Sequence, residues 1–283
     1  MEKVAFGYGN RIDEATLSGG SWQAPLANIQ TRRLAQKARS TTTATTDTVI
    51  NIELPEPRLI QVIGIHAHNL STDAEIEISA GTTLGGTDQY DVPSYDVWPA
   101  VYSTMSMHWT DYHFWSGKLD PETRKGYPSN LIHIVGTAVK SKYWTIKIID
   151  TGNEDGYVEI GRIFIGRLLQ PKHNVIYGAE IGWEDNSEIE ASLYGVEYYN
   201  DIPKTRVARV NYDYSDRTEA LDGMFELQHL SGITKEVLFI GNTQDQKQMV
   251  RLGFLGRFRK IDPIKWHFMD IHSTGFEVKE LLS

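Results

Sequence analysis

Two histidines stand two residues apart, at His66 and His68. Side chains alternate along a β-strand, so this spacing predicts both imidazoles on one face, at a separation that suits a single metal ion. The spacing supplies no third ligand, however. Because two histidines flanking an alanine are more often part of a solvated strand than a metal site, we expect no metal there.

An Asp- and Asn-rich segment at 150–156, DTGNEDG, is a second candidate for metal binding. An EF-type calcium loop aligned on Gly156 puts Thr151 in the first ligand position and Arg162 where a bidentate glutamate belongs. Neither residue suits its position. The segment therefore predicts a solvated turn without calcium.

Carboxylate pairs such as Glu184 with Asp185 and Asp88 with Asp91 are the acids that a glycoside hydrolase would use. Such an enzyme requires a defined separation in space, which spacing along the chain does not give. The sequence contains no nucleophile elbow, Walker loop or dinucleotide-binding glycine motif. We therefore predict a protein that is not an enzyme, without catalytic residues, metal or cofactor. A glycan hydrolase remains the second alternative.

Aromatic residues gather in the stretch 82–128, which lacks any strand or helix period. A long aperiodic stretch in a compact domain is usually functional or packed on the fold. Flat aromatic side chains stack on sugar rings, form protein contacts or plug the end of a β-sandwich. The candidate contact residues, for a glycan or a protein, are Trp98, Tyr102, Trp109, Tyr112 and Trp115.

The elements around these residues are predicted to be mainly strands. Alternation over Tyr143–Gly166, with a turn at Asp155-Gly156, predicts a β-hairpin with one buried face around which the first part of the chain is organised. Further strands are expected at 48–54 and 59–67, with Pro55 and Pro57 forming a turn between them. This pattern predicts a β-sandwich over residues 1–170.

The pattern changes after Pro171. Strands alternate with one long helix at 216–231, which Asp216 is expected to cap, and another strand is predicted at 249–258. The residues 171–283 therefore form a second, α+β domain with one helix in this prediction. Its expected core includes Leu221, Phe225, Phe276 and Val278.

Composition limits the function further. The formal net charge of the 283 residues is −9, which argues against general nucleic-acid binding, because phosphate neutralisation needs clustered Lys and Arg. The chain contains no cysteine, so disulfides and Cys-ligated metals are excluded. No apolar run is long enough to span a membrane, and the first residues lack the apolar segment of a signal peptide. We expect synthesis in a cytoplasm.

Several phrases of the sequence resemble known families. ATLSGGSW, RLIQVIGIHAHNLSTDAEIEIS and KYWTIKIIDTGNEDGYVEIGRIFIG look like a discoidin-like, galactose-binding-type jelly roll over roughly residues 10–168. DVWPAVYS, GWED, VLFIG, FLGRF and FEVKEL resemble virion proteins encoded among the tail genes of long, noncontractile-tailed bacteriophages. The order of elements in the second domain is similar to that of the β-barrel-plus-helix unit that builds phage tail rings, which implies a β-barrel with one helix for residues 171–283.

These resemblances imply a structural protein of a tail tip or baseplate. The implied location is the virion tail, with other tail proteins as partners and a homo-oligomeric ring of three- or six-fold symmetry as the assembly. A ring would also close the edge strands of the second domain. The alternative from another class is a carbohydrate-binding module that recognises host surface glycans through the aromatic stretch.

Overall fold

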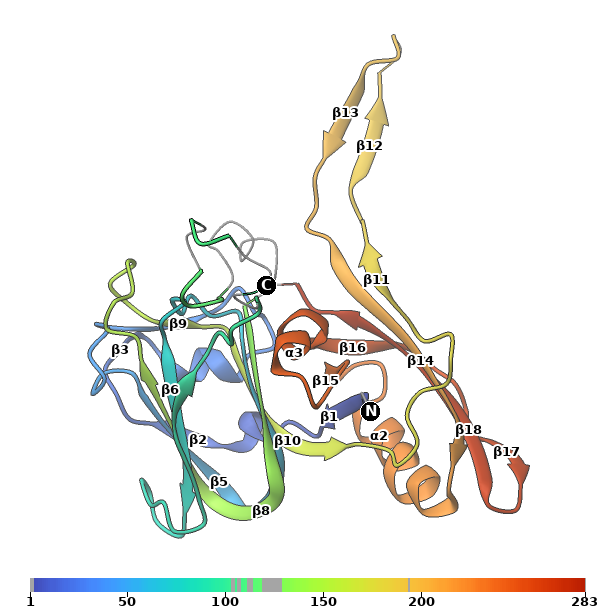
Figure 1. Ribbon diagram of the computed structural model, residues 1–283, viewed down its shortest axis with the longest axis horizontal. Helices are drawn as coiled ribbons and strands as arrows, with labels where there is room; N and C mark the ends of the chain where they lie inside the picture. The colour runs from blue at the N-terminus through green and yellow to red at the C-terminus, as the bar shows by residue number, and fades with distance from the viewer. Residues whose placement is uncertain are drawn as a thin grey trace.

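A computed structural model describes residues 3–102, 105, 108–110, 114–118, 129–192 and 194–282. Within these residues the fold is mainly β, as the sequence predicts (Figure 1). A thirteen-stranded sheet runs through the described part of the molecule, with the path β11-β14-β18-β16-β15-β1-β10-β5-β8-β6-β7, while β17 pairs with β18 and β2 with β5. The two ends of this path belong to two units.

The first unit is a β-sandwich. Its strands and short 3₁₀ turns are η1 (Ile12–Glu14), β2 (Thr16–Ser18), β3 (Trp22–Ala24), η2 (Leu26–Gln30), β4 (Ala38–Ser40), β5 (Val49–His66), β6 (Glu75–Gly81), β7 (Tyr90–Asp96), β8 (Asn130–Ile149), β9 (Glu159–Ile160) and β10 (Arg162–Leu169). A separate sheet, β3-β4-β9, packs on one end. Ile, Val and Leu side chains from both layers fill the core, with Trp144 fully buried among them.

The predicted hairpin over Tyr143–Gly166 is wrong. Strand β8 pairs with β5 and β6, and β10 pairs with the other side of β5 and with β1. The long strand β5 therefore lies between the two strands that the sequence suggested were neighbours. The predicted turn at Pro55 and Pro57 is also absent, because β5 is continuous and absorbs both prolines where its register with β8 shifts.

The second unit combines strands with short helices. Its elements are β11 (Glu180–Glu184), β12 (Glu188–Ala191), β13 (Glu197–Asn200), β14 (Thr205–Ser215), the π-helical turn η4 (Glu219–Met224), α2 (Phe225–Ser231), β15 (Glu236–Ile240), α3 (Gln246–Leu252), β16 (Phe254–Ile261), β17 (Lys265–Phe268) and β18 (Ile271–Glu280). The strand predicted at 249–258 begins only at Phe254, because Asp245 caps α3 by accepting from Lys247 N. No helix in the described ranges has the length and apolarity needed to cross a membrane.

The predicted core of the second unit is partly wrong. Phe276 and Val278 are buried on β18, where Phe276 contacts the rings of Phe6 and Phe258. Leu221 is half-buried, but Phe225 is 59% exposed. Asp216 caps the helix as expected, yet the first turns are π-helical and hold an extra residue per turn, which rotates the following positions and turns Phe225 outward.

The first strand, β1 (Ala5–Tyr8), belongs to both units. It pairs with β10 of the sandwich on one side and with β15 of the second unit on the other. Phe6 is fully buried in the core of the second unit, against Phe239, Phe258 and Phe276. The predicted boundary, 1–170 and 171–283, therefore misses that the first residues of the chain complete the second unit's core.

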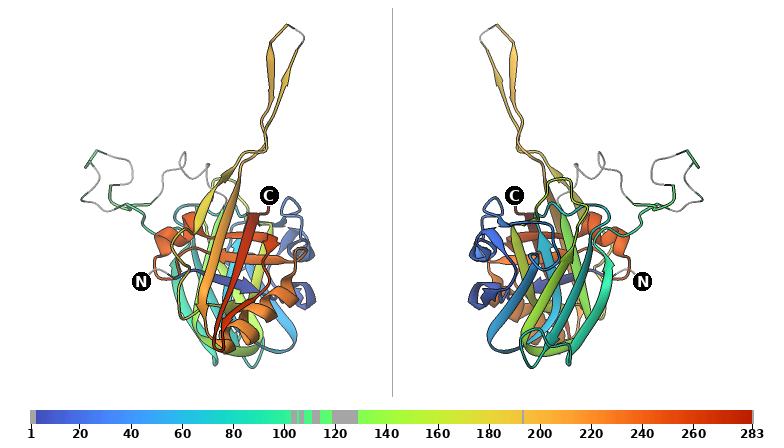
Figure 2. Two further views of the ribbon diagram at one scale, coloured as in Figure 1. Left: turned by 90° about the vertical axis from the view of Figure 1, so that its right-hand side faces the viewer. Right: turned by 90° about the vertical axis from the view of Figure 1, so that its left-hand side faces the viewer.

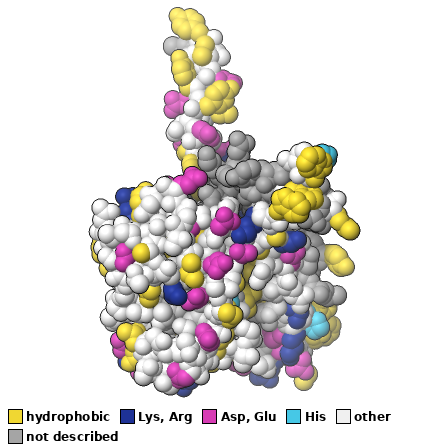
Figure 3. All heavy atoms as spheres, turned by 60° about the vertical axis from the view of Figure 1, so that its left-hand side comes forward, with side chains coloured by type: hydrophobic (Ala, Val, Ile, Leu, Met, Phe, Trp, Pro, Cys, Tyr) yellow, Lys and Arg dark blue, Asp and Glu magenta, His cyan; other side chains and the backbone are white. Residues whose placement is uncertain are grey.

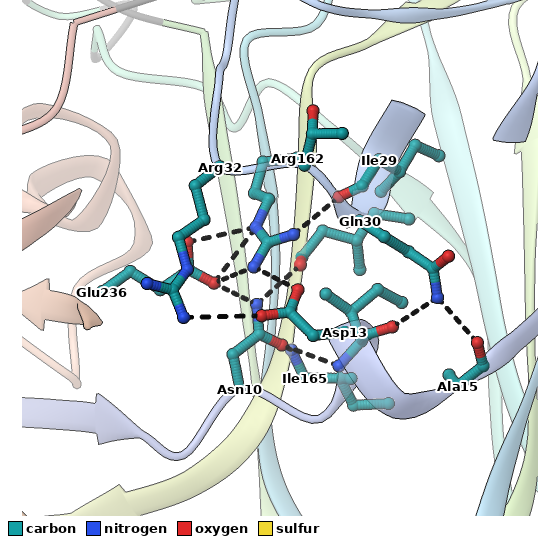
Figure 4. A network of polar contacts seen from close by, with 12 residues as sticks. Asn10, Asp13, Ala15, Ile29, Gln30, Arg32, Arg162, Ile165 and Glu236 are labelled. Atoms are coloured by element: carbon teal, nitrogen blue, oxygen red, sulfur yellow. Dashed lines mark hydrogen bonds and ion pairs between the residues drawn. The ribbon is translucent and has the colours of Figure 1, made fainter. Parts of the chain in front are cut away.

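A buried ion pair joins the two units beside β1 (Figure 4). Arg162 on β10 is fully buried, and its guanidinium lies 2.5 Å from the carboxylate of Glu236 on β15 and 2.6 Å from that of Asp13. It also donates to the carbonyl oxygen of Ile29. Asn10 donates to Glu236 and accepts from the backbone N–H of Ile165. A buried charge is tolerated only when it is paired and hydrogen-bonded in this way.

We predict that Glu236→Ala lowers the free energy of unfolding by about 3–5 kcal/mol, because it leaves a guanidinium buried without its principal carboxylate. The matched control is Glu226→Ala, which removes a partly exposed pair with Arg167 and should cost less than about 1 kcal/mol. Chemical denaturation of both variants measures the difference. Equal losses would show that the buried pair is not important at the junction.

Candidate functional site

The two histidines do not form a shared face. Strand β5 ends at His66, and Ala67 adopts a positive φ of 56°, which turns the chain before His68. The Nδ1 atom of His66 lies 2.8 Å from the side chain of Asn130, and burial lowers the pKa of His66 to about 4. His68 packs edge-on against Trp98. The part of the chain that the structure describes holds no cluster of three or more His, Asp or Glu side chains placed to bind a metal.

The candidate acids are occupied by structural partners. Asp150 accepts hydrogen bonds from Ser71 and Asn153, which organises the predicted turn. Glu184 pairs with Arg259 at 3.0 Å, and Asp185 pairs with Lys204 at 3.4 Å, so these neighbouring carboxylates face different cations.

The turn that holds Asp88 is stabilised by its own carboxylate. Asp88 accepts from the backbone N–H of Thr82, and that hydrogen bond lowers the pKa of Asp88. Each of these arrangements gives the carboxylate a structural role.

The aromatic stretch is divided between core and surface. Trp98 is 2% exposed and donates to the carbonyl oxygen of Leu70, so its assignment as a contact residue is wrong. Although the stretch 82–128 shows no strand period, its residues Tyr90–Asp96 form β7, which leads Trp98 directly into the sandwich. Tyr102 is half-buried, whereas Trp109 and Trp115 are exposed. Tyr112 lies outside the described residues.

A hairpin arm, residues 185–203, projects from the second unit (Figures 1 and 2). Its strands β12 and β13 pair only with each other in the described structure, and every residue of both strands is exposed. Directly opposite residues share a face, so one face carries Ile189, Ala191, Tyr199 and Glu197, and the other carries Glu188, Glu190, Tyr198 and Asn200. Tyr194, in the turn, is 95% exposed.

The arm is acidic as well as apolar. It contains five acidic residues and no lysine or arginine. Hydrophobic and acidic side chains alternate along it in the space-filling view, with no basic side chain between them (Figure 3). A two-stranded ribbon in water is marginally stable and exposes two unpaired edges. Such an arm is typical of a segment that contacts another chain.

Strand β11, at the base of the arm, is a second open edge. In the described residues it pairs with β14 on one side only. Ile181 and Trp183 lie on its core-facing side, opposite Ala208 and Arg206, yet they are 45% and 49% exposed. The path of the sheet ends there, and no further strand of the described residues pairs with β11 on this side.

A groove of about 530 Å³ crosses the outer face of this edge. Gly182 lines it and lies opposite Val207 in the register. Arg209 with Glu180 flanks it on one side, and Arg259 with Glu184 on the other. A Cβ atom on Gly182 would meet nothing within 4 Å, so this position faces open space in the groove.

A second groove, of about 360 Å³, lies on the sandwich beside the β3-β4-β9 sheet. Lys37 and Arg39 both bind the carboxylate of Glu159, and Gln23 lines the same groove. Burial raises the pKa of Glu159, but the hydrogen bonds and charges of Arg39 and Lys37 outweigh it and hold the pKa below its ordinary value. Arg39 also stacks on the ring of Tyr157.

The sequence analysis did not predict that residues 185–203 project from the body of the protein as an arm. The available signal was composition, because acidic and apolar residues alternate over 185–203 without one basic residue. The second groove, beside the β3-β4-β9 sheet, was not predicted because its residues come from strands that are distant in the sequence.

No protein-family model and no curated protein matches the sequence. Among solved structures, the chain is similar to the family 32 carbohydrate-binding module of NanJ from Clostridium perfringens in complex with galactose, at 12% identity and a TM-score of 0.37, over 59% of this chain and 100% of that chain.

Two further solved structures are similar in the same way. One is the family 32 module of AlyQ in complex with 4,5-unsaturated mannuronic acid, at 14% identity and a TM-score of 0.35, over 56% of this chain and 96% of that chain. The other is the lectin-binding domain of lectinolysin with Lewis b, at 9% identity and a TM-score of 0.33, over 57% and 98% of the two chains. Similarity at this level transfers neither a ligand nor a binding site to this chain.

Proposed function

We propose that this protein is a structural subunit that assembles with further copies of itself through the hairpin arm. The arm is the observation that carries the proposal. In a monomer, this ribbon of acidic and apolar residues leaves both of its edges and both of its faces exposed to water, so it adds no stability to the fold. In an assembly, contact between the ribbon and a neighbouring copy buries apolar side chains of both chains.

The proposed assembly is a symmetric ring in the tail tip or baseplate of a bacteriophage. The tail-gene phrases of the sequence support this location, and the open edge at β11 supports a ring, since cyclic association hides such edges. Other tail proteins are the proposed further partners, and the virion tail is the proposed location. The sandwich unit then lies beside the ring, held to it by Arg162 and Glu236.

A second candidate function is carbohydrate binding by the sandwich unit, and the polar groove at Arg39 and Glu159 favours it. Sugar sites combine a few fixed charged or amide groups with a stacking surface. Here ion pairs with Glu159 hold Lys37 and Arg39 in place without a ligand, and Gln23 lines the same groove. This site is distinct from the aromatic stretch that the sequence suggested.

Removing the arm tests the main proposal. Ser187 accepts from the backbone N–H of Ile202, so the base of the arm is already bridged, and residues 188–200 can be replaced by Gly-Gly. We expect this variant to sediment as a monomer with an unchanged melting temperature, while the wild-type chain forms oligomers, because the arm makes no described pairing with the body. In phage, the same deletion should stop incorporation into tails. An arm-deleted chain that assembles normally would refute the proposal.

Glycan-array binding tests the second candidate. We expect Glu159→Gln to weaken binding at least about tenfold, because it releases both cations, whereas Arg58→Ala, which removes an exposed pair with Glu56, should have no effect. Loss of binding in Trp109→Ala or Trp115→Ala instead would place the sugar on the aromatic stretch. A wild-type chain that binds no glycan would exclude this function.

A further inference from the structure

We infer that His66 is a proton-sensitive contact between the two units: when its imidazole binds a proton, Asn130 can no longer accept from Arg206, and the junction loosens. His66 ends β5 of the sandwich, and Arg206 lies on β14 of the second unit. All three residues are buried. The contact lies inside one chain, so it does not depend on the proposed assembly.

The imidazole of His66 folds back over its own strand. A Cβ atom at Gly64 would lie 2.6 Å from Nε2 of His66 and 3.4 Å from a methyl group of Leu238. The ring therefore occupies space that only a glycine at position 64 leaves open. Nε2 has no hydrogen-bond partner among the described residues. Such an enclosed position disfavours a charged ring.

Asn130 connects this ring to the second unit. It lies directly opposite His66 in the register of β5 and β8. Its amide nitrogen donates to Nδ1 of His66 at 2.8 Å and to the carbonyl oxygen of Ser129 at 3.1 Å, while its amide oxygen accepts from Arg206 at 3.0 Å. The reverse orientation would set oxygen against oxygen and the amide nitrogen against the guanidinium. Nδ1 is therefore an acceptor, and the neutral ring carries its proton on Nε2.

A proton on Nδ1 breaks this arrangement. The charged ring donates from both nitrogens, so Nδ1–H would point at the amide nitrogen of Asn130, which is also a donor. Asn130 can accept that proton only by turning its oxygen toward the ring. The same rotation turns its NH2 group toward the guanidinium of Arg206. Because the amide has a single oxygen, it serves either the charged ring or Arg206.

The charges around His66 act against the proton as well. The charged side chains packed around the ring come from separate elements: Arg162 on β10 and Arg206 on β14, with the carboxylates that bind them, Asp13 on η1, Glu236 on β15 and Glu280 on β18. Burial lowers the pKa of His66 to about 4, and the charges of Arg206 and Arg162 act in the same direction. The three carboxylates are bound to guanidinium groups, so the two cations face the ring with their partners already engaged.

Protonation therefore changes the junction in two ways. The guanidinium of Arg206 loses its hydrogen bond to the sandwich, and it then faces a second positive charge across the junction. Its bonds to Glu280 stay within the second unit. Strand β1 still joins the two units, so the expected response is a looser junction in a chain that remains folded.

The sign of the pH dependence follows from the lowered pKa. The unfolded chain takes up a proton on His66 near its ordinary value of 6.5, whereas the folded chain does so only near 4. Stability from the neutral ring is thus complete above about pH 6.5 and is lost as the pH falls toward 4. Between pH 7 and pH 5, His66 alone should lower the equilibrium constant for folding roughly 20-fold.

Two variants and two measurements test the inference. Urea denaturation at pH 7 and pH 5 gives the folding constant, and hydrogen exchange of the Arg206 amide, which donates to Glu280, reports on the junction. We expect protection of that amide, corrected for intrinsic exchange, to fall at least about tenfold in the wild type at pH 5. His66→Gln should remove this loss and the 20-fold term. Asn130→Asp should remove both as well, because a carboxylate accepts from the charged ring and from Arg206 together.

The matched control is His133→Gln. Burial also lowers the pKa of His133 to about 4, but its ring contacts Tyr90 within the sandwich. This variant should reduce the pH dependence of unfolding and leave the loss of protection at Arg206 unchanged. If His66→Gln does not fold, Asn130→Asp decides. Acid sensitivity in Asn130→Asp equal to that of the wild type, or constant protection of Arg206 in the wild type, would overturn the inference.

Discussion

The fully buried guanidinium of Arg162 is the constraint on which the rest of the structure depends. It lies on β10 of the sandwich and reaches Glu236 on β15 of the second unit, beside the strand β1 that both units share. A charge at this depth is stable only with its partners in place, so the pair specifies how β10 and β15 lie on either side of β1. The two units therefore form one continuous sheet instead of two domains on a linker.

That continuity determines what the open edges can do. One end of the sheet path is β7, which carries Pro93 and the acidic residues Asp91 and Asp96, features that discourage pairing. The other end is β11, which has Ile181 and Trp183 half exposed and carries Glu180 and Glu184 but no proline. In the proposed assembly, the acidic arm beside this edge contacts a neighbouring copy.

Local patterns in the sequence predicted much of this fold. Alternation in FEVKEL placed Phe276 and Val278 on the inward side of a strand, and Asp216 marked the start of the helix. The failures have physical causes that single-sequence periodicity does not contain. A π-helical turn rotated Phe225 into solvent, and β5 inserted between β8 and β10, which are neighbours in sequence only.

The candidate surfaces were harder to predict than the fold. Tryptophan is a residue type that often forms contacts on a surface, but Trp98 lies in the core, because β7 leads into the sandwich. The groove at Arg39 and Glu159 joins residues 120 positions apart, a separation that no local motif spans. The groove at Gly182 could not be predicted from the sequence, because a glycine looks the same in an edge strand as in a central strand. It is identified only once β11 is known to be an edge strand.

The central claim is that copies of this chain assemble into a ring through the arm. Class averages of the purified, full-length oligomer from electron micrographs test it most directly, because rotational symmetry distinguishes this interface from any other. The account predicts closed rings with three-fold or higher symmetry. Two-fold symmetric dimers, in which identical surfaces meet, or monomers at all concentrations would contradict it.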